Sequence, residues 1–201
     1  MQTLETEMNV EPVVLEGESV RLEPLSLDHL PRLVEVGLGG DVFRWFPQPV
    51  RSADDMRAFV EASLADQAAG RALPFATIER RSGLAVGSTR YGNIDRDHRR
   101  VEIGWTWLAP AWQRTALNTE AKYLMLRYAF ETWNCHRVEF KTDSLNVPSR
   151  RALERIGARQ EGTLRNHMVT AGGRLRHSVY FSVIREEWPG VEAALEAKLR
   201  G

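Results

Sequence analysis

Residues 101–122 read VEIGWTWLAPAWQRTALNTEAK. The first part, Val101–Leu108, alternates apolar and polar side chains, which is typical of a half-buried strand and places Glu102 opposite Val101, Ile103 and Trp105. After Pro110 the apolar positions take a helical spacing that continues to Ala129. A helix that begins after such a turn presents free backbone N–H groups and partial positive charge at its N-terminus. The segment is therefore a candidate site for phosphate, although every strand–turn–helix shares this property.

The chain on either side of this segment alternates between strand and helix patterns. Because a long helix separates the strand that ends near Trp107 from the strand that begins at Arg137, we expect these two strands to be parallel. No repeat or linker interrupts the chain. We therefore predict one α+β domain over residues 13–201, with a mixed, mostly antiparallel sheet flanked by helices, after a flexible N-terminal tail at residues 1–12. The expected strands are 20–25, 75–79, 85–91, 101–108, 137–142, 162–169 and 178–184. The expected helices begin near residues 26, 52, 148 and 192, and a further long helix follows Pro110, with Thr115 or Asn118 as its cap.

Composition excludes several classes of protein. The 201 residues include 27 Lys plus Arg and 27 Asp plus Glu, so the net charge of zero argues against a nucleic-acid-binding coat or a polybasic membrane surface. The single cysteine, Cys135, cannot form a disulfide within the chain or a cysteine-based zinc site. The acidic start lacks a signal-peptide pattern and no long apolar run occurs, so we expect a cytoplasmic protein without a metal site or membrane span.

Four motifs in order along the chain resemble one known family. The strand VEIGWTWL, the turn QRTALN with the helix start TEA, and the later segments NVPSRRALERIGA and EGTLR are similar to the GNAT N-acetyltransferases, in the RimJ/RimL-type branch of ribosomal-protein-alanine acetyltransferases. The resemblance covers roughly residues 13–188. It implies a GNAT fold, acetyl-CoA as co-substrate, and direct transfer of the acetyl group to a primary amine.

The same resemblance implies roles for individual residues. Glu102 would be the general base that takes the amine proton, and Ser149 would protonate the departing CoA thiolate, because Leu153 stands where many GNAT enzymes have a tyrosine. A bulge between Gly104 and Trp107 would aim backbone amides at the thioester. The residues implied to bind acetyl-CoA are Trp107, Leu108, Gln113, Arg114, Thr115, Ala116, Leu117, Asn118, Thr119 and Asn146.

The residues themselves leave other interpretations open. Glu102 also fits a solvated strand carboxylate, and Asn146 and Ser149 also fit ordinary helix-capping residues. Ala116 and Asn118 replace glycines of the family loop, which is consistent with a degenerate GNAT site in a non-catalytic acyl-CoA-binding or interaction module. For an enzyme, both a protein N-terminus and a small molecule remain candidate acceptors. The late hairpin and final helix are candidate contacts for a homodimer.

Overall fold

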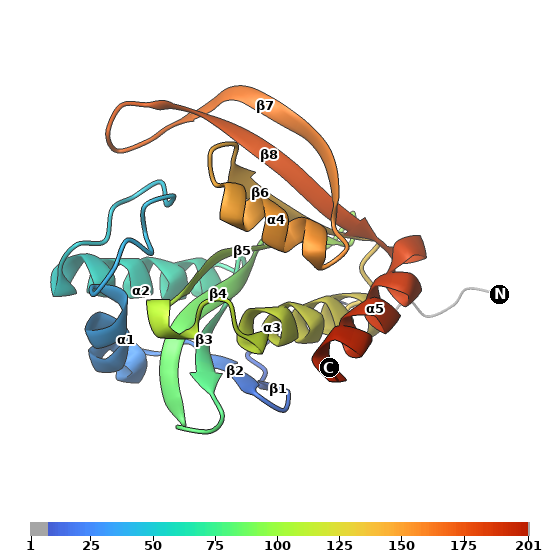
Figure 1. The fold of residues 1–201 in the computed structure, drawn as a ribbon, viewed down its shortest axis with the longest axis horizontal. Helices are drawn as coiled ribbons and strands as arrows, with labels where there is room; N and C mark the ends of the chain where they lie inside the picture. Colours follow the sequence, from blue (N-terminus) through green and yellow to red (C-terminus); the bar gives the residue numbers. More distant parts are fainter. Residues whose placement is uncertain (1–7, 201) are drawn as a thin grey trace.

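The computed structural model describes residues 8–200, and these form an eight-stranded sheet with helices on both faces (Figure 1). The strands are β1 (Leu15–Glu16), β2 (Val20–Pro24), β3 (Leu73–Glu79), β4 (Leu84–Asp95), β5 (Arg100–Leu108), β6 (Arg137–Asp143), β7 (Arg159–Val169) and β8 (Leu175–Ile184). The helices are α1 (Leu30–Gly37), α2 (Ala53–Ala68), α3 (Ala116–Arg127), α4 (Val147–Arg155) and α5 (Trp188–Arg200). Short 3₁₀ turns cover Leu27–His29, Pro110–Trp112 and Arg185–Glu187, and one π-helical turn, Tyr128–Thr132, extends α3.

The N-terminal segment packs against the domain from the first described residue. Met8 is 4% exposed, and the indole Nε1 of Trp133 donates a hydrogen bond to the Asn9 carbonyl oxygen over 2.6 Å. Residues 1–7 of the predicted tail lie outside the described residues. The packed chain thus includes residues that precede the predicted domain start at residue 13.

The sheet order is β1-β2-β3-β4-β5-β6-β8-β7. Every neighbouring pair is antiparallel except β5 and β6, which are parallel with Arg100 opposite Arg137 and Glu102 opposite Glu139. The predicted parallel pair is confirmed, and so is the mixed, mostly antiparallel sheet. The long connection through α3 makes this pairing sterically accessible.

Two hydrophobic clusters hold the helices onto opposite faces of the sheet. One cluster joins α3, α4 and α5 to inward residues such as Phe75, Ile103 and Phe140. The other joins α1 and α2 to residues that include Ile78 and Trp107. Figure 1 shows α1 and α2 at the β2–β4 half of the sheet, whereas α4 lies beside β6 and β7.

Local sequence signals explain where α2 and α3 begin. Ser52 caps α2 by accepting a hydrogen bond from the Asp55 amide, and Asp55 accepts from the Ser52 amide in return. In α3, the buried carboxylate of Glu120 accepts from the backbone amides of Glu18, Ser19 and Val20 over 2.6, 2.8 and 2.9 Å. This contact fixes α3 against the β1–β2 turn and gives the glutamate of the TEA motif a structural role.

The sheet opens where β5 and β6 stop pairing. The parallel ladder covers only Arg100–Glu102 of β5, so residues 103–108 have no partner strand on the β6 side. Opposite β4, Ser88 pairs with Trp107 and Arg90 pairs with Gly104, so one β4 residue faces two β5 residues. This is a β-bulge at Trp105 and Thr106, as predicted from the sequence, and Trp105 has a positive φ of 49°.

Candidate active site

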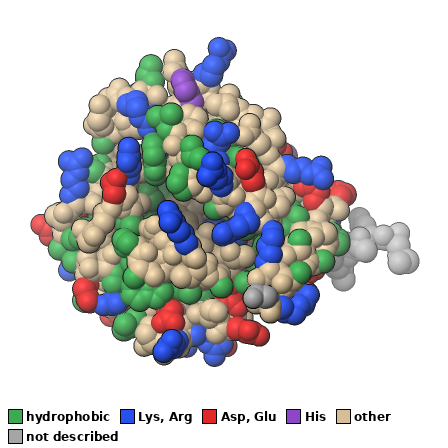
Figure 2. Space-filling view, viewed as in Figure 1, with side chains coloured by type: hydrophobic (Ala, Val, Ile, Leu, Met, Phe, Trp, Pro, Cys, Tyr) green, Lys and Arg blue, Asp and Glu red, His purple; other side chains and the backbone are tan. Residues whose placement is uncertain are grey.

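A cavity of about 800 Å³ occupies the opening between β5 and β6. Its walls come from the α1–α2 loop, the bulged part of β5, the start of α3, the end of β6, α4 and the β7–β8 hairpin. Figure 2 shows a hollow in the centre of this face with Lys and Arg side chains around it. The cavity brings together segments that are far apart in the sequence, which is typical of a ligand site.

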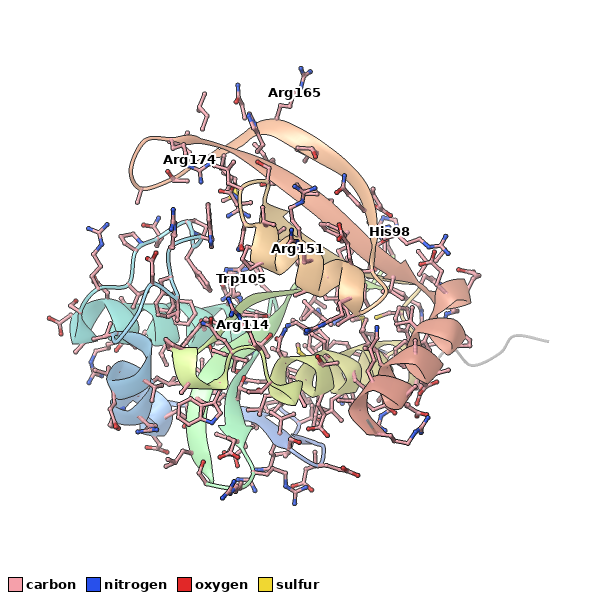
Figure 3. All side chains as sticks on the ribbon, in the orientation of Figure 1. His98, Trp105, Arg114, Arg151, Arg165 and Arg174 are labelled. Atoms are coloured by element: carbon pink, nitrogen blue, oxygen red, sulfur yellow. The ribbon has the colours of Figure 1, made fainter. Side chains whose placement is uncertain are left out.

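The turn before α3 forms one end of the cavity and carries three of the predicted residues. The Gln113 side chain donates to the Leu108 carbonyl oxygen over 2.9 Å, and Thr115 caps α3 by accepting from the Leu117 amide over 3.3 Å. Between them Arg114 has a φ of +61°, a backbone conformation that glycine adopts more easily. Arg114, Trp105 and Arg151 all line the cavity, and Figure 3 shows Arg114 below Trp105 and α4 in this view.

The two glycine replacements in this turn lie inside the helix. Ala116 is the first residue of α3 and Asn118 follows in its first turn, so neither needs a left-handed backbone. The loss of glycine therefore leaves the helical N-terminus and its free amides intact.

The structure brings nine of the twelve predicted site residues to the cavity wall. Three do not line it: Ala116 is exposed at the helix start, Leu117 is buried in the core, and Thr119 accepts a hydrogen bond from Arg155 over 3.2 Å. The nine are Glu102, Trp107, Leu108, Gln113, Arg114, Thr115, Asn118, Asn146 and Ser149.

The N-terminus of α4 forms the wall that faces this turn. Asn146 is the N-cap residue of α4, and its side-chain oxygen accepts a hydrogen bond from the Ser149 amide over 3.2 Å. The capping interpretation is therefore correct for Asn146, and both side chains also line the cavity. Arg151 and Arg155 line it further along the same helix, so this end combines cations with two helix N-termini.

Glu102 lies at the opposite end and is 3% exposed, so the interpretation as a solvated strand carboxylate is wrong. Its Oε2 accepts a hydrogen bond from Asn93 over 2.7 Å and lies 3.3 Å from Lys141 Nζ. Glu102 also lines a second, polar cavity of about 770 Å³ that reaches the surface beside Asp95 and Asp97. Burial and the nearby Glu102 carboxylate raise the pKa of Tyr180, which lines this second cavity. Glu102 thus lines both cavities.

Strict strand alternation predicts that Trp105 points to the face opposite Glu102, and the structure shows that this prediction is wrong. The bulge turns Trp105 onto the Glu102 face, where its ring stacks against the Arg90 guanidinium with 3.7 Å between guanidinium carbon and ring centroid. A Cβ at Gly92 would lie only 2.5 Å from the Trp105 ring, so the glycine makes room for it. Trp107 keeps the predicted core position and packs against Phe43 at 5.0 Å between centroids.

Two lysines of the cavity wall were not predicted from the sequence. Lys122 reaches the bulge from α3, and its Nζ donates to Thr106 over 2.7 Å and to Thr89 over 3.1 Å. Burial lowers the pKa of Lys122 to about 7. Lys141 comes from β6 and contacts Glu102. The sequence signal for Lys122 is its helical spacing, because it lies three and four residues before the buried Met125 and Leu126 of α3. For Lys141 the contact with Glu102 depends on how β5 and β6 pair.

The β8 residue Arg176 is a third residue that sequence reasoning missed. It is 5% exposed, lines the cavity, and donates from Nη1 to the Trp45 carbonyl oxygen over 3.3 Å. Desolvation lowers the pKa of the Arg176 guanidinium, and the nearby Asp143 carboxylate opposes that shift. Arg176 therefore ties the hairpin to the α1–α2 loop across the end of the cavity.

Within residues 8–200, no group of three or more His, Cys, Asp or Glu side chains is placed to hold a metal ion. None of the helices in the same range has the length and apolar character needed to cross a membrane.

Comparison with known proteins matches this architecture to one family. The profile of the acetyltransferase (GNAT) domain matches residues 19–159. The uncharacterized N-acetyltransferase YnaD of Bacillus subtilis (strain 168) is 28% identical over 148 residues, which are 74% of this chain and 83% of YnaD.

Solved structures extend the match to the whole fold. A GCN5-related N-acetyltransferase from Brucella melitensis has a TM-score of 0.87 and 34% identity, over 94% of this chain and 86% of that one. Mycobacterium smegmatis RimJ, solved in complex with CoA-disulfide, shares the fold with a TM-score of 0.80 and 23% identity, over 94% of this chain and 96% of RimJ. The chain belongs to the GNAT acetyltransferase family.

Proposed function

We propose that the protein transfers the acetyl group of acetyl-CoA directly to a primary amine. The observation that carries this proposal is that one continuous cavity is lined both by cations at the starts of α3 and α4 and by the buried Glu102. Such a cavity suits a long donor with phosphates at one end and a reactive thioester at the other. CoA supplies a good leaving group, and the protein supplies orientation and proton transfer.

The cationic end has the chemistry to hold the phosphates of CoA. The first-turn amides of α3 carry partial positive charge, and Arg114 and Arg151 add guanidinium groups that bind phosphate oxygens in pairs. Asn118 in the first turn of α3 and Asn146 at the start of α4 also line the cavity. The pantetheine arm would run between these residues toward Trp105.

The bulged end has the chemistry for acetyl transfer. Glu102 would take the proton of the incoming amine, and backbone amides of the bulge would polarise the thioester oxygen. The amine nitrogen then attacks the carbonyl carbon, the C–S bond breaks, and the Ser149 hydroxyl protonates the thiolate. The Ser149 side chain lines the cavity, while its backbone amide is held by Asn146.

A thiol-release assay tests the proposal. Acetyl-CoA is mixed with the protein and with peptides that carry a free N-terminus, polyamines or aminoglycosides, and mass spectrometry identifies the acetylated product. Acetyl transfer to at least one amine, lowered in Ser149→Ala while acetyl-CoA affinity is kept, supports the assignment. Binding of acetyl-CoA without thiol release across the panel would favour a non-catalytic module.

A further inference from the structure

Two of the three lysines of the chain line the central cavity. The sequence contains Lys122, Lys141 and Lys198 and no other lysine. Lys122 and Lys141 contribute to the cavity wall, whereas Lys198 lies on α5 and donates to the Arg155 carbonyl oxygen. The protein thus places two of its own primary amines where the proposed function requires an acceptor amine.

Lys141 occupies the environment that an acceptor amine needs. Its Nζ lies 3.3 Å from Oε2 of Glu102, the proposed base. The Trp105 and Tyr180 ring centroids lie 5.9 and 6.0 Å from the same nitrogen, which is within the range of cation–π attraction. The side chain is 18% exposed, so the amine is held in place without being sealed in the core.

Lys122, the other lysine of the cavity wall, approaches β5 from the opposite face and has different partners. In the described chain its amine donates to the hydroxyls of Thr89 and Thr106, and neither group can take a proton from it as a carboxylate can. It rises from α3, on the face that holds Val101 and Ile103, whereas Glu102 points to the opposite face. Lys122 therefore lacks the base that Lys141 has.

We propose that Lys141 is an internal acceptor, so that the protein acetylates its own Lys141 side chain from acetyl-CoA. This inference rests on the proposed function, because it uses the same donor and the same base. Glu102 takes a proton from the Lys141 ammonium, and the neutral nitrogen attacks the thioester carbonyl carbon. The N–C bond forms, the C–S bond breaks, and the nitrogen gives up its second proton. The products are Nε-acetyl-Lys141, CoA thiol and one proton released to solvent.

Acetylation would change the site itself. The acetylated nitrogen carries no positive charge, so the ion pair between Lys141 and Glu102 is lost. The amide fills the place beside Trp105 and Tyr180 that an external amine would use. Lys141 thereby competes with external acceptors for the acetyl group.

Site-resolved mass spectrometry tests the inference. The full-length protein is incubated with acetyl-CoA that carries a ¹³C-labelled acetyl group, in mildly alkaline buffer without added amine. Proteolytic peptides then report label separately at each of the three lysines. Lys198 measures the uncatalysed reaction within the same sample. We expect Lys141 to gain label at least about 10²-fold faster than Lys198, the lower end of what a positioned base contributes.

Two carboxylate variants separate the role of Glu102 from a general effect of charge. Glu102→Gln is expected to bring the Lys141 rate down to the Lys198 rate while calorimetry still detects acetyl-CoA binding. Glu139→Gln is the matched control, because Glu139 pairs with Glu102 across the sheet but forms its ion pairs with Arg100 and Arg137. It is expected to keep the preference for Lys141.

The possible failures are distinguishable. If acetyl-CoA binds and an external amine is acetylated but Lys141 gains label no faster than Lys198, the inference is wrong and the proposed function stands. Label mainly on Lys122, or an undiminished Lys141 rate in Glu102→Gln, also overturns the inference. If calorimetry detects no acetyl-CoA binding, the proposed function and the inference both fail.

Discussion

Replacing Glu102 by glutamine should slow acetyl transfer in a manner that depends on pH. Glutamine has nearly the same shape, so the hydrogen bond that Asn93 donates over 2.7 Å can be kept with the remaining side-chain oxygen. The charge that faces Lys141 is lost, and the amide cannot accept a proton. General bases typically contribute about 10²- to 10⁴-fold, and kcat/KM should fall within that range below the pKa of the acceptor amine.

The fall should shrink as the pH rises, because the amine then loses its proton to solvent without help. For an α-amino acceptor the difference should disappear above about pH 8, and for a lysine-like amine only above about pH 10. The pH at which wild type and Glu102→Gln converge therefore also reports which type of amine is the substrate.

The measurement is kcat/KM for the acceptor across this pH range at saturating acetyl-CoA. Glu139→Gln removes a neighbouring carboxylate on the same face and should keep the wild-type profile. Calorimetry should give both variants the acetyl-CoA affinity of the wild type. A rate for Glu102→Gln equal to wild type at low pH, or a loss of equal size at every pH, would refute the role of Glu102 as a base.

Three further predictions concern α3 and the turn before it. Glu120→Gln removes a charge that accepts three backbone hydrogen bonds, so the free energy of unfolding should fall by about 2–4 kcal/mol in urea titrations, and an unchanged value would disprove the contact. Lys122 has a lowered pKa of about 7 in the folded state and binds its proton more tightly when unfolded, so stability should rise with pH from about 7 to the unfolded value of 10.5. Lys122→Met should remove that rise, on the order of 4 kcal/mol, and a persistent rise in the variant would assign it to other groups. Arg114→Ala should weaken CoA binding by roughly 1–3 kcal/mol at low salt and by less at high salt, and equal affinities at low salt would exclude a phosphate contact.

The order of the longer strands and helices could be predicted from sequence because each of them has a clear local signal. The period of the apolar residues changes from strand to helix after Pro110, and Ser52 with Asp55 forms a capping box that marks the start of α2. The parallel pairing of β5 and β6 followed from the long connection between them. The two-residue strand β1 carries no such pattern, and it forms because it pairs with β2.

The orientation of Trp105 could not be predicted, because a bulge breaks the alternation on which the prediction depends. The pairing of β4 with β5 places the bulge, and the contact of the Trp105 ring with Gly92, which pairs with Glu102, shows that the ring lies on the Glu102 face. The burial of Glu102 and its contact with Lys141 depend in the same way on the register of β5 and β6. Neighbouring strands set these features, and the sequence of one strand does not contain them.

We propose that the cavity between β5 and β6 holds acetyl-CoA. Calorimetric titration of the purified protein with acetyl-CoA tests this claim most directly, with the melting temperature measured on the same samples. We predict saturable heat at one site per chain, and a gain in stability of about 2.7 kcal/mol when the free ligand reaches 100 times its Kd. No heat and no change in melting temperature with either acetyl-CoA or CoA would contradict the account.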